Sequence, residues 1–163
     1  MNTTAVNLIE GYQENSWLIR RHADSLSDAE ALLQPAFEAI TFNWVLGHIV
    51  EHRNLALVAL DKTSLWPAAV DRLYAAEPGG LTGAERRRSV LQLLDDLEAA
   101  EQRLIAALEA ASGDWLTEAV MTHFGVEKPR GVYVAGLQWH ETYHVGQLGL
   151  LRSLALAQRK RQP

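Results

Sequence analysis

Four long segments of the chain carry apolar residues at the spacing of an α-helix, and this pattern constrains the fold more than any other feature. In the first segment, at about residues 4–23, Leu8, Tyr12 and Ile19 fall on one helix face. The remaining segments span about residues 41–60, 82–111 and 132–157. Helices of this kind bury their apolar faces most simply by packing together. The sequence therefore predicts an all-α fold, a four-helix bundle with antiparallel helices.

Local signals predict where helices begin and end. Ser27 and Glu30 have the spacing of a capping box, which predicts a short helix between the first two long ones. Thr82 and Glu85 have the same spacing and predict the start of the third long helix. Gly113 predicts its end, because glycine commonly follows the last helical residue.

Two long connections join these helices, at residues 61–80 and 113–130, and the second contains a short strand or hairpin at about residues 119–126. Turns in helix bundles are usually shorter. We therefore expect the connections to cover one end of the bundle or to cross it, and to form a wall of a site. Their length leaves the packing order of the helices open. A chain of 163 residues fits one domain, so residues 1–163 are expected to form a single unit.

Composition excludes several classes of function. The chain has no cysteine, which rules out a disulfide scaffold, a thiolate metal site and a cysteine nucleophile. Its formal net charge of −5 argues against a nucleic-acid partner, because such partners select a basic surface. The N-terminal residues lack the pattern of a signal peptide, and no apolar run approaches the about 18 residues of a membrane helix. We expect a cytoplasmic protein that has no membrane partner.

Two pairs of histidines carry the strongest chemical signal. His140 and His144 lie one turn apart on a helix face that points into the core, and His48 and His52 repeat this spacing in the second segment. A buried imidazole needs hydrogen-bond partners or a metal ion. The pairs predict one metal site built from both helices, or alternatively hydrogen-bonded core histidines with His52 exposed. His123, in a connection, is a weaker candidate that could lie on the surface or cover the site.

Two further polar residues could serve such a site in a catalytic or supporting role. Gln147 shares a face with His144 and could hold a ligand ring or a water, or could make an ordinary hydrogen bond between helices. Glu101 lies in the apolar stripe of the third segment, where a carboxylate is costly unless it is paired. It could pair with a ligand histidine, accept a proton or reach an end of the bundle. Glu141 is expected on a more polar side of its helix.

Several short runs together resemble one protein family over nearly the whole chain. These runs are Tyr12-Gln13-Glu14-Asn15, Leu26-Ser27-Asp28, Trp44-Val45-Leu46-Gly47-His48 and, most specifically, His140-Glu141-Thr142-Tyr143-His144-Val145-Gly146-Gln147. With them the chain resembles the DinB-like family of metalloenzymes. The resemblance implies a four-helix bundle in which His48, His140 and His144 bind a metal ion, and it leaves His52 outside the ligand set. The chain departs from the family at Val145, where many members have arginine.

Three histidine ligands leave coordination positions for water or substrate, which is the layout of a catalytic site. Nitrogen ligands suit zinc, nickel, iron or copper, and the sequence does not choose among them. The resemblance implies an enzyme acting on small molecules, with a low-molecular-weight thiol as a cosubstrate in S-transfer. The alternatives are a metal-dependent hydrolase and a non-catalytic metal-binding protein of the stress response. Small residues and tryptophans on the helix faces suggest a homodimer.

Overall fold

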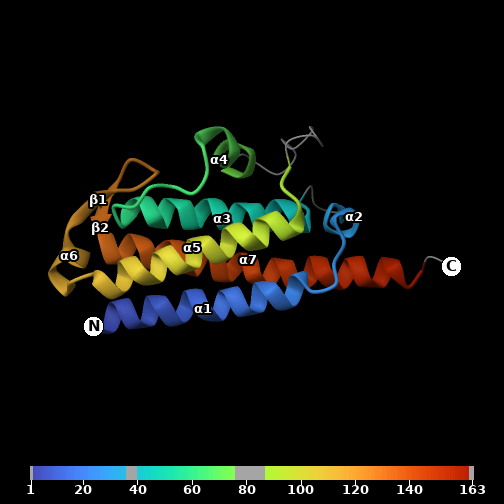
Figure 1. Ribbon diagram of the computed structural model, residues 1–163, viewed down its shortest axis with the longest axis horizontal. Coiled ribbons are helices and arrows are strands. Elements are labelled where there is room, and N and C mark those ends of the chain that lie inside the picture. Colours follow the sequence, from blue (N-terminus) through green and yellow to red (C-terminus); the bar gives the residue numbers. More distant parts are fainter. Residues whose placement is uncertain (1, 36–39, 76–86, 162–163) are drawn as a thin grey trace.

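The computed structural model describes residues 2–35, 40–75 and 87–161, and it is a bundle of four long helices (Figure 1). The long helices are α1 (Thr3–Ala23), α3 (Phe42–Ala59), α5 (Val90–Ala110) and α7 (Arg130–Arg159). Between them, the described residues form the short elements α2 (Asp28–Ala31), α4 (Ala68–Ala75), α6 (Gly113–Thr117), β1 (Ala119–Met121) and β2 (Glu127–Pro129). The predicted all-α fold is confirmed. Within these ranges, no helix is both long and apolar enough to cross a membrane.

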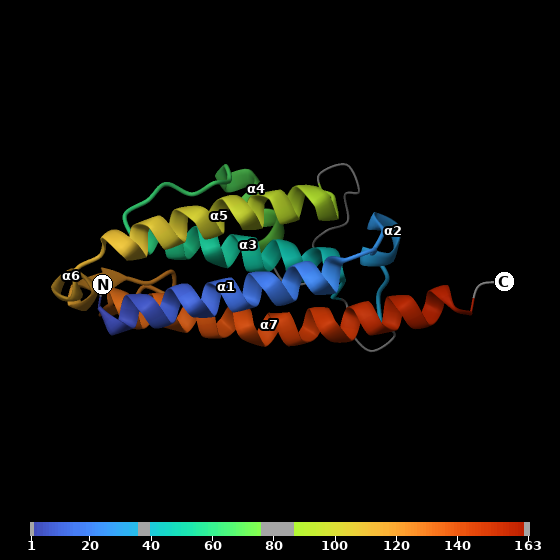
Figure 2. The ribbon, with the colours of Figure 1, turned by 60° about the horizontal axis from the view of Figure 1, so that its bottom comes forward.

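The order of the helices differs from a simple antiparallel bundle. In the packing, α1 and α3 each contact both α5 and α7. Figures 1 and 2 show that α1 and α7 run side by side in one direction, while α3 and α5 run in the opposite direction. Helices α3 and α5, which follow one another among the four long helices, are therefore parallel. The connection that contains α4 allows this arrangement, because it is long enough to return along the bundle before α5 begins.

Two of the local signals for helix boundaries, the Ser27–Glu30 capping box and Gly113, lie within the described residues. The capping box of Ser27 and Glu30 is confirmed, with each side chain bonded to the other residue's backbone N–H. Gly113 does not end α5, because that helix stops at Ala110 and Gly113 is the first residue of α6. The side chain of Ser112 accepts a hydrogen bond from a backbone N–H of α6, which starts a new helix at this point.

The start of the third long helix also differs from the prediction. Thr82 and Glu85 lie outside the described residues, and the helix begins at Val90. Ser89 and Gln92 form the capping box that fixes this start, with the Ser89 side chain accepting from the Gln92 backbone. Glutamine can take the place of glutamate in this motif. The capping-box signal is therefore also present at Ser89 and Gln92, seven residues after Thr82 and Glu85.

The predicted hairpin is present and lies against the start of α7. Its strands are antiparallel, with Val120 opposite Lys128. The second strand, Glu127–Pro129, lies directly after the predicted range. Gly125 has a positive φ of 73° in the connecting turn, a conformation that glycine adopts without strain. The hairpin brings residues 122–124 over the side of α7, so this connection forms a wall as expected.

The core consists of two hydrophobic clusters separated by a buried polar layer. One cluster includes Ile19, Phe42, Ile49, Leu97 and Leu148. The other includes Leu8, Tyr12, Leu57, Leu104 and Leu137. Between them lie Arg53 of α3 and Glu141 of α7, whose exposed fractions are 0% and 1%. The expectation that Glu141 lies on a polar face of its helix is therefore wrong, because this carboxylate has a buried partner.

Arg53 connects all four long helices. Its Nε donates to Glu141 Oε2 at 2.9 Å and its Nη2 donates to Oε1 at 2.6 Å, so the pair is bidentate. The same guanidinium donates to the Leu97 carbonyl of α5 at 3.1 Å and to Ser16 Oγ of α1 at 2.9 Å. Removing one member would leave a buried charge without its counterpart, which is the costly way to break such a pair.

We predict that Arg53→Met lowers the free energy of unfolding by about 3–5 kcal/mol, because Glu141 then stays buried without its counter-ion. Urea denaturation followed by circular dichroism in the presence of a chelator would measure the change without a contribution from bound metal. Arg20→Met is the matched control. Arg20 pairs with Glu101 at 3.0 Å but is 40% exposed, and such pairs contribute only about 0–1 kcal/mol.

A double variant completes this test. Replacing Arg53 by methionine and Glu141 by leucine removes both charges together, so we expect it to be more stable than Arg53→Met alone. A loss below about 1 kcal/mol in the single variant, equal to that of a surface pair, would show that the buried pair does not hold the bundle together.

Candidate metal centre

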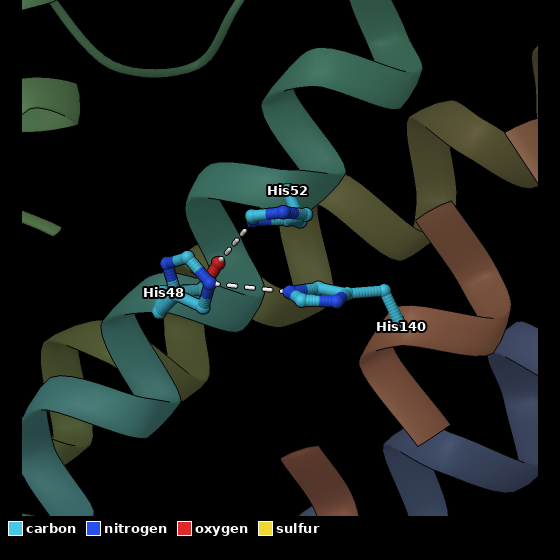
Figure 3. Close-up of side chains that lie close together, drawn as sticks. All are labelled: His48, His52 and His140. Carbon is cyan, nitrogen blue, oxygen red and sulfur yellow. Dashed lines mark hydrogen bonds between the residues drawn. The ribbon is translucent and has the colours of Figure 1, made fainter. Parts of the chain in front are cut away.

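Histidines from α3 and α7 meet at the seam between these helices. His48 Nε2 lies 3.3 Å from His140 Nε2, and His144 Nε2 lies 2.9 Å from the same atom. The ring of His52 stacks on that of His140 with 4.3 Å between the ring centroids. Figure 3 shows His48 and His52 on one helix facing His140 on the other. The structure thus brings the predicted residues His48, His140 and His144 together, with His52 beside them.

Hydrogen bonds hold two of these rings so that Nε2 carries a lone pair. His48 Nδ1 lies 2.8 Å from the Tyr74 carbonyl oxygen, and His144 Nδ1 lies 2.7 Å from Gln147 Oε1. Both oxygens only accept hydrogen bonds, so each Nδ1 donates and each neutral ring keeps its lone pair on Nε2. A proton on His140 Nε2 could satisfy only one of these lone pairs. A cation would satisfy all three nitrogens, with the outer hydrogen bonds orienting the rings.

Burial keeps the histidines neutral. It lowers the pKa of His48 to about 4, and His52 adds to this lowering. Burial also lowers the pKa of His144 to about 4, although the hydrogen bond to Gln147 acts in the opposite direction. The pKa of His140 is lowered as well, first by burial and then by His52. Because metal ions bind the neutral imidazole, these side chains have the required protonation state at neutral pH.

Ring orientation differs between His144 and His52, the two candidates for a third ligand. The rings of His48, His140 and His144 are nearly perpendicular to one another, with interplanar angles of 71°, 77° and 82°. His52 is close to parallel with His140, at 23°. A ligand lone pair lies in the ring plane, so perpendicular rings can point to one position while stacked rings point side by side. One nitrogen each from His48, His52 and His140 nevertheless lie within 4.8 Å, so this group could also hold an ion.

The spacing and the surroundings of the nitrogens fit a divalent ion. Two nitrogens bound to a tetrahedral ion at about 2.0–2.1 Å lie about 3.3–3.4 Å apart. The Nε2 atoms of His48 and His140 match this separation at 3.3 Å, while those of His140 and His144 are closer, at 2.9 Å. Glu51 places a carboxyl group beside the rings, with Oε2 at 2.8 Å from His52 Nδ1 and 4.0 Å from His48 Nδ1. Burial raises the pKa of this group, and a cation held by the histidines would favour its charged form.

The two supporting residues that the sequence suggested have different surroundings. Gln147 contacts the Nδ1 of His144 and donates from its Nε2 to Tyr143 Oη at 3.3 Å, so it can orient the ring. Glu101 lies on α5 and accepts from Arg20 of α1 at 3.0 Å. The structure does not bring Glu101 to the histidines, because a partner on α1 satisfies its charge within the apolar stripe.

Sequence reasoning missed the contribution of α4. The Tyr74 carbonyl reaches His48 from this helix, and the Tyr74 ring packs against Gly47, where an added Cβ would lie 2.1 Å from the ring. Glycine at this position therefore permits the close approach of α4. The Trp44 ring stacks on the ring of His48, with 4.8 Å between the ring centroids. A glycine in the middle of a helix, next to a candidate ligand, was the available signal.

A cavity of about 220 Å³ opens beside the histidines. His52 and His140 form part of its wall, together with the hairpin residues 122–124 and the first turns of α7. His123 belongs to this wall, with its ring centroid 6.1 Å from that of His52. The cavity therefore lies next to the histidine cluster, with walls from α7, α3 and the hairpin.

The fold and the histidine cluster define a four-helix bundle with a candidate metal centre. The family model of the DinB superfamily matches residues 15–148, so the chain belongs to this superfamily. A conserved protein from Enterococcus faecalis, known from its crystal structure, has a similar fold with a TM-score of 0.74 and 18% sequence identity. The match covers 96% of this chain and 99% of that one, and at this identity it shows the fold alone. No curated protein matches the sequence.

We predict that His48→Ala and His144→Ala lose most of the bound metal, while His52→Ala retains about one ion per chain. The reason is that His52 stacks on a ligand ring instead of completing the perpendicular set. Metal analysis of untagged protein by mass spectrometry would measure this, with thermal melting to check that each variant folds. Equal metal loss in His52→Ala and His48→Ala, with retention in His144→Ala, would make His52 the third ligand.

Proposed function

We propose that this protein is a metal-dependent enzyme that acts on small molecules, with His48, His140 and His144 as the metal ligands. The observation that supports it best is the convergence of three Nε2 atoms from two helices, with distances of 3.3 and 2.9 Å to the central His140. His48 and His144 use their Nδ1 atoms for hydrogen bonds to Tyr74 and Gln147, so their Nε2 atoms are free to bind an ion. Three histidines leave open positions on the ion, which is typical of catalytic centres.

The metal would be zinc, nickel or iron, the borderline ions that imidazole ligands suit. When bound, such an ion supplies positive charge that favours the thiolate form of a thiol. The chain has no cysteine, so a thiol in this reaction must come from a cosubstrate. We therefore propose S-transfer from a low-molecular-weight thiol to an electrophilic acceptor in the cavity beside His140. The S–C bond forms as the acceptor's leaving group departs with its bonding electrons, and the thiol proton is released to solvent.

The roles of the protein groups follow from their contacts. Tyr74 and Gln147 hold the Nδ1 protons of His48 and His144, which orients both rings toward His140. Glu51 places a carboxylate next to the histidines and favours a cation there. The described wall of the cavity contains no cysteine or serine nucleophile, so the protein positions reactants instead of forming a covalent intermediate through such a residue.

We predict that low-molecular-weight thiols bind directly at the metal centre. Cobalt-substituted protein titrated with cysteine, glutathione and 2-mercaptoethanol should develop a thiolate-to-cobalt charge-transfer band at millimolar thiol, because three histidine ligands would leave positions on the ion for a thiolate. The His48→Ala variant under the same conditions is the control, and it should show no such band. Methionine, which has no thiol, controls for general effects of sulfur compounds.

A different outcome would identify the competing reaction. If no thiol perturbs the cobalt spectrum while the protein turns over an ester or amide from a substrate panel, the S-transfer proposal fails and a metal-dependent hydrolase replaces it. If the protein binds no metal at all under any condition, both enzymatic proposals fail.

A further inference from the structure

The cavity beside the histidines has a gap in its wall at Gly136 of α7. This glycine is exposed and lines the cavity, and a Cβ built on it would meet no atom within 4 Å. Gly136 lies one helical turn before His140, so the gap and the histidine share a line along the helix. Glycine in the interior of a helix costs stability relative to alanine. No close contact requires a glycine at position 136, so we attribute this glycine to the open space of the cavity next to it.

The walls around this gap are aromatic. Phe124 of the hairpin and Trp139 of α7 line the cavity and are 79% and 70% exposed, so both rings have surface that a ligand can contact, although the His123 ring packs against Phe124 with 3.8 Å between the centroids. Tyr133 forms part of the same wall. The volume of about 220 Å³ is larger than the roughly 150 Å³ of a cavity that holds benzene. One substituted aromatic ring therefore fits, and aromatic walls pack well against such a ring.

Two polar residues of the cavity wall can contact a ligand. Tyr133 Oη lies 2.8 Å from His123 Nδ1 and also accepts from the His123 backbone N–H at 3.3 Å. These bonds occupy Nδ1, so Nε2 of His123 is the ring nitrogen that remains for a ligand. Lys128 adds a positive charge at the wall. None of the described residues that line the cavity has a carboxylate, so the cavity favours an acceptor or an anion.

We propose that this cavity binds a small molecule with one aromatic ring and a carboxylate or similar acceptor group, with the ring over Gly136. His123 and Lys128 would receive the acceptor, and the ring would lie next to His140. As a statement about the substrate this rests on the proposed function, because it names what the enzyme would act on. The binding itself does not require the metal, so the two proposals can fail separately.

The test uses benzoate as the probe and leucine substitutions at two glycines. A Cβ at Gly136 would meet no atom within 4 Å, so Gly136→Leu would place its side chain in the cavity, and we expect benzoate binding to weaken by at least about tenfold. Gly146→Leu is the matched control, because Gly146 lies on the same helix, also has no atom within 4 Å of an added Cβ, and does not line the cavity. Chemical-shift titration of the full chain, as purified and after chelation, would measure the dissociation constants.

Further probes separate the ring from the charge. Acetate has the charge without the ring and should bind at least about tenfold more weakly than benzoate. His123→Phe keeps an aromatic wall but removes the donor, so it should weaken benzoate about tenfold while leaving toluene unaffected. Benzoate binding that is equal in Gly136→Leu and Gly146→Leu, or no stronger than acetate binding, would overturn the inference. Metal content measured on the same samples reports on the proposed function independently.

Discussion

The buried pair of Arg53 and Glu141 fixes how the four long helices are rotated against one another. A guanidinium that bonds to α1, α5 and α7 at once can do so only from the centre of the bundle. His52 and His140 are the sequence neighbours of this pair, and successive residues are about 100° apart around a helix. When the charges face the centre, the histidines must lie at the seam between α3 and α7. The candidate metal centre thus depends on an ion pair that does not contact it.

The histidines at the seam between α3 and α7 are partly buried. Burial lowers the pKa values of His48 and His144 to about 4, and a cavity of about 220 Å³ lies beside the cluster. Neutral rings whose Nδ1 protons are held by fixed oxygens present their lone pairs without rearrangement. Glu51 would compensate the charge of a cation at this position. A site of this kind would be arranged for a metal before the metal arrives.

The connections determine what the site can accept. The bundle is shared with the protein from Enterococcus faecalis at 18% identity, so the helices define the fold and do not define a reaction. In this chain the hairpin brings His123 and Phe124 over α7, and α4 brings the Tyr74 carbonyl to His48. Both contributions come from segments outside the four long helices. Differences in such segments would change the substrate while the histidines stay in place.

The sequence alone determined the features that arise within one helix. Helical periodicity predicted the four segments, and the i,i+4 spacing placed His140 and His144 on one face, because both follow from the local geometry of the backbone. Only the tertiary structure decided that α3 and α5 are parallel, that Glu141 is buried, and that Glu101 pairs away from the histidines. It also decided that four histidines meet and that a cavity opens beside them. These features depend on contacts between helices far apart in the chain, which no local pattern encodes.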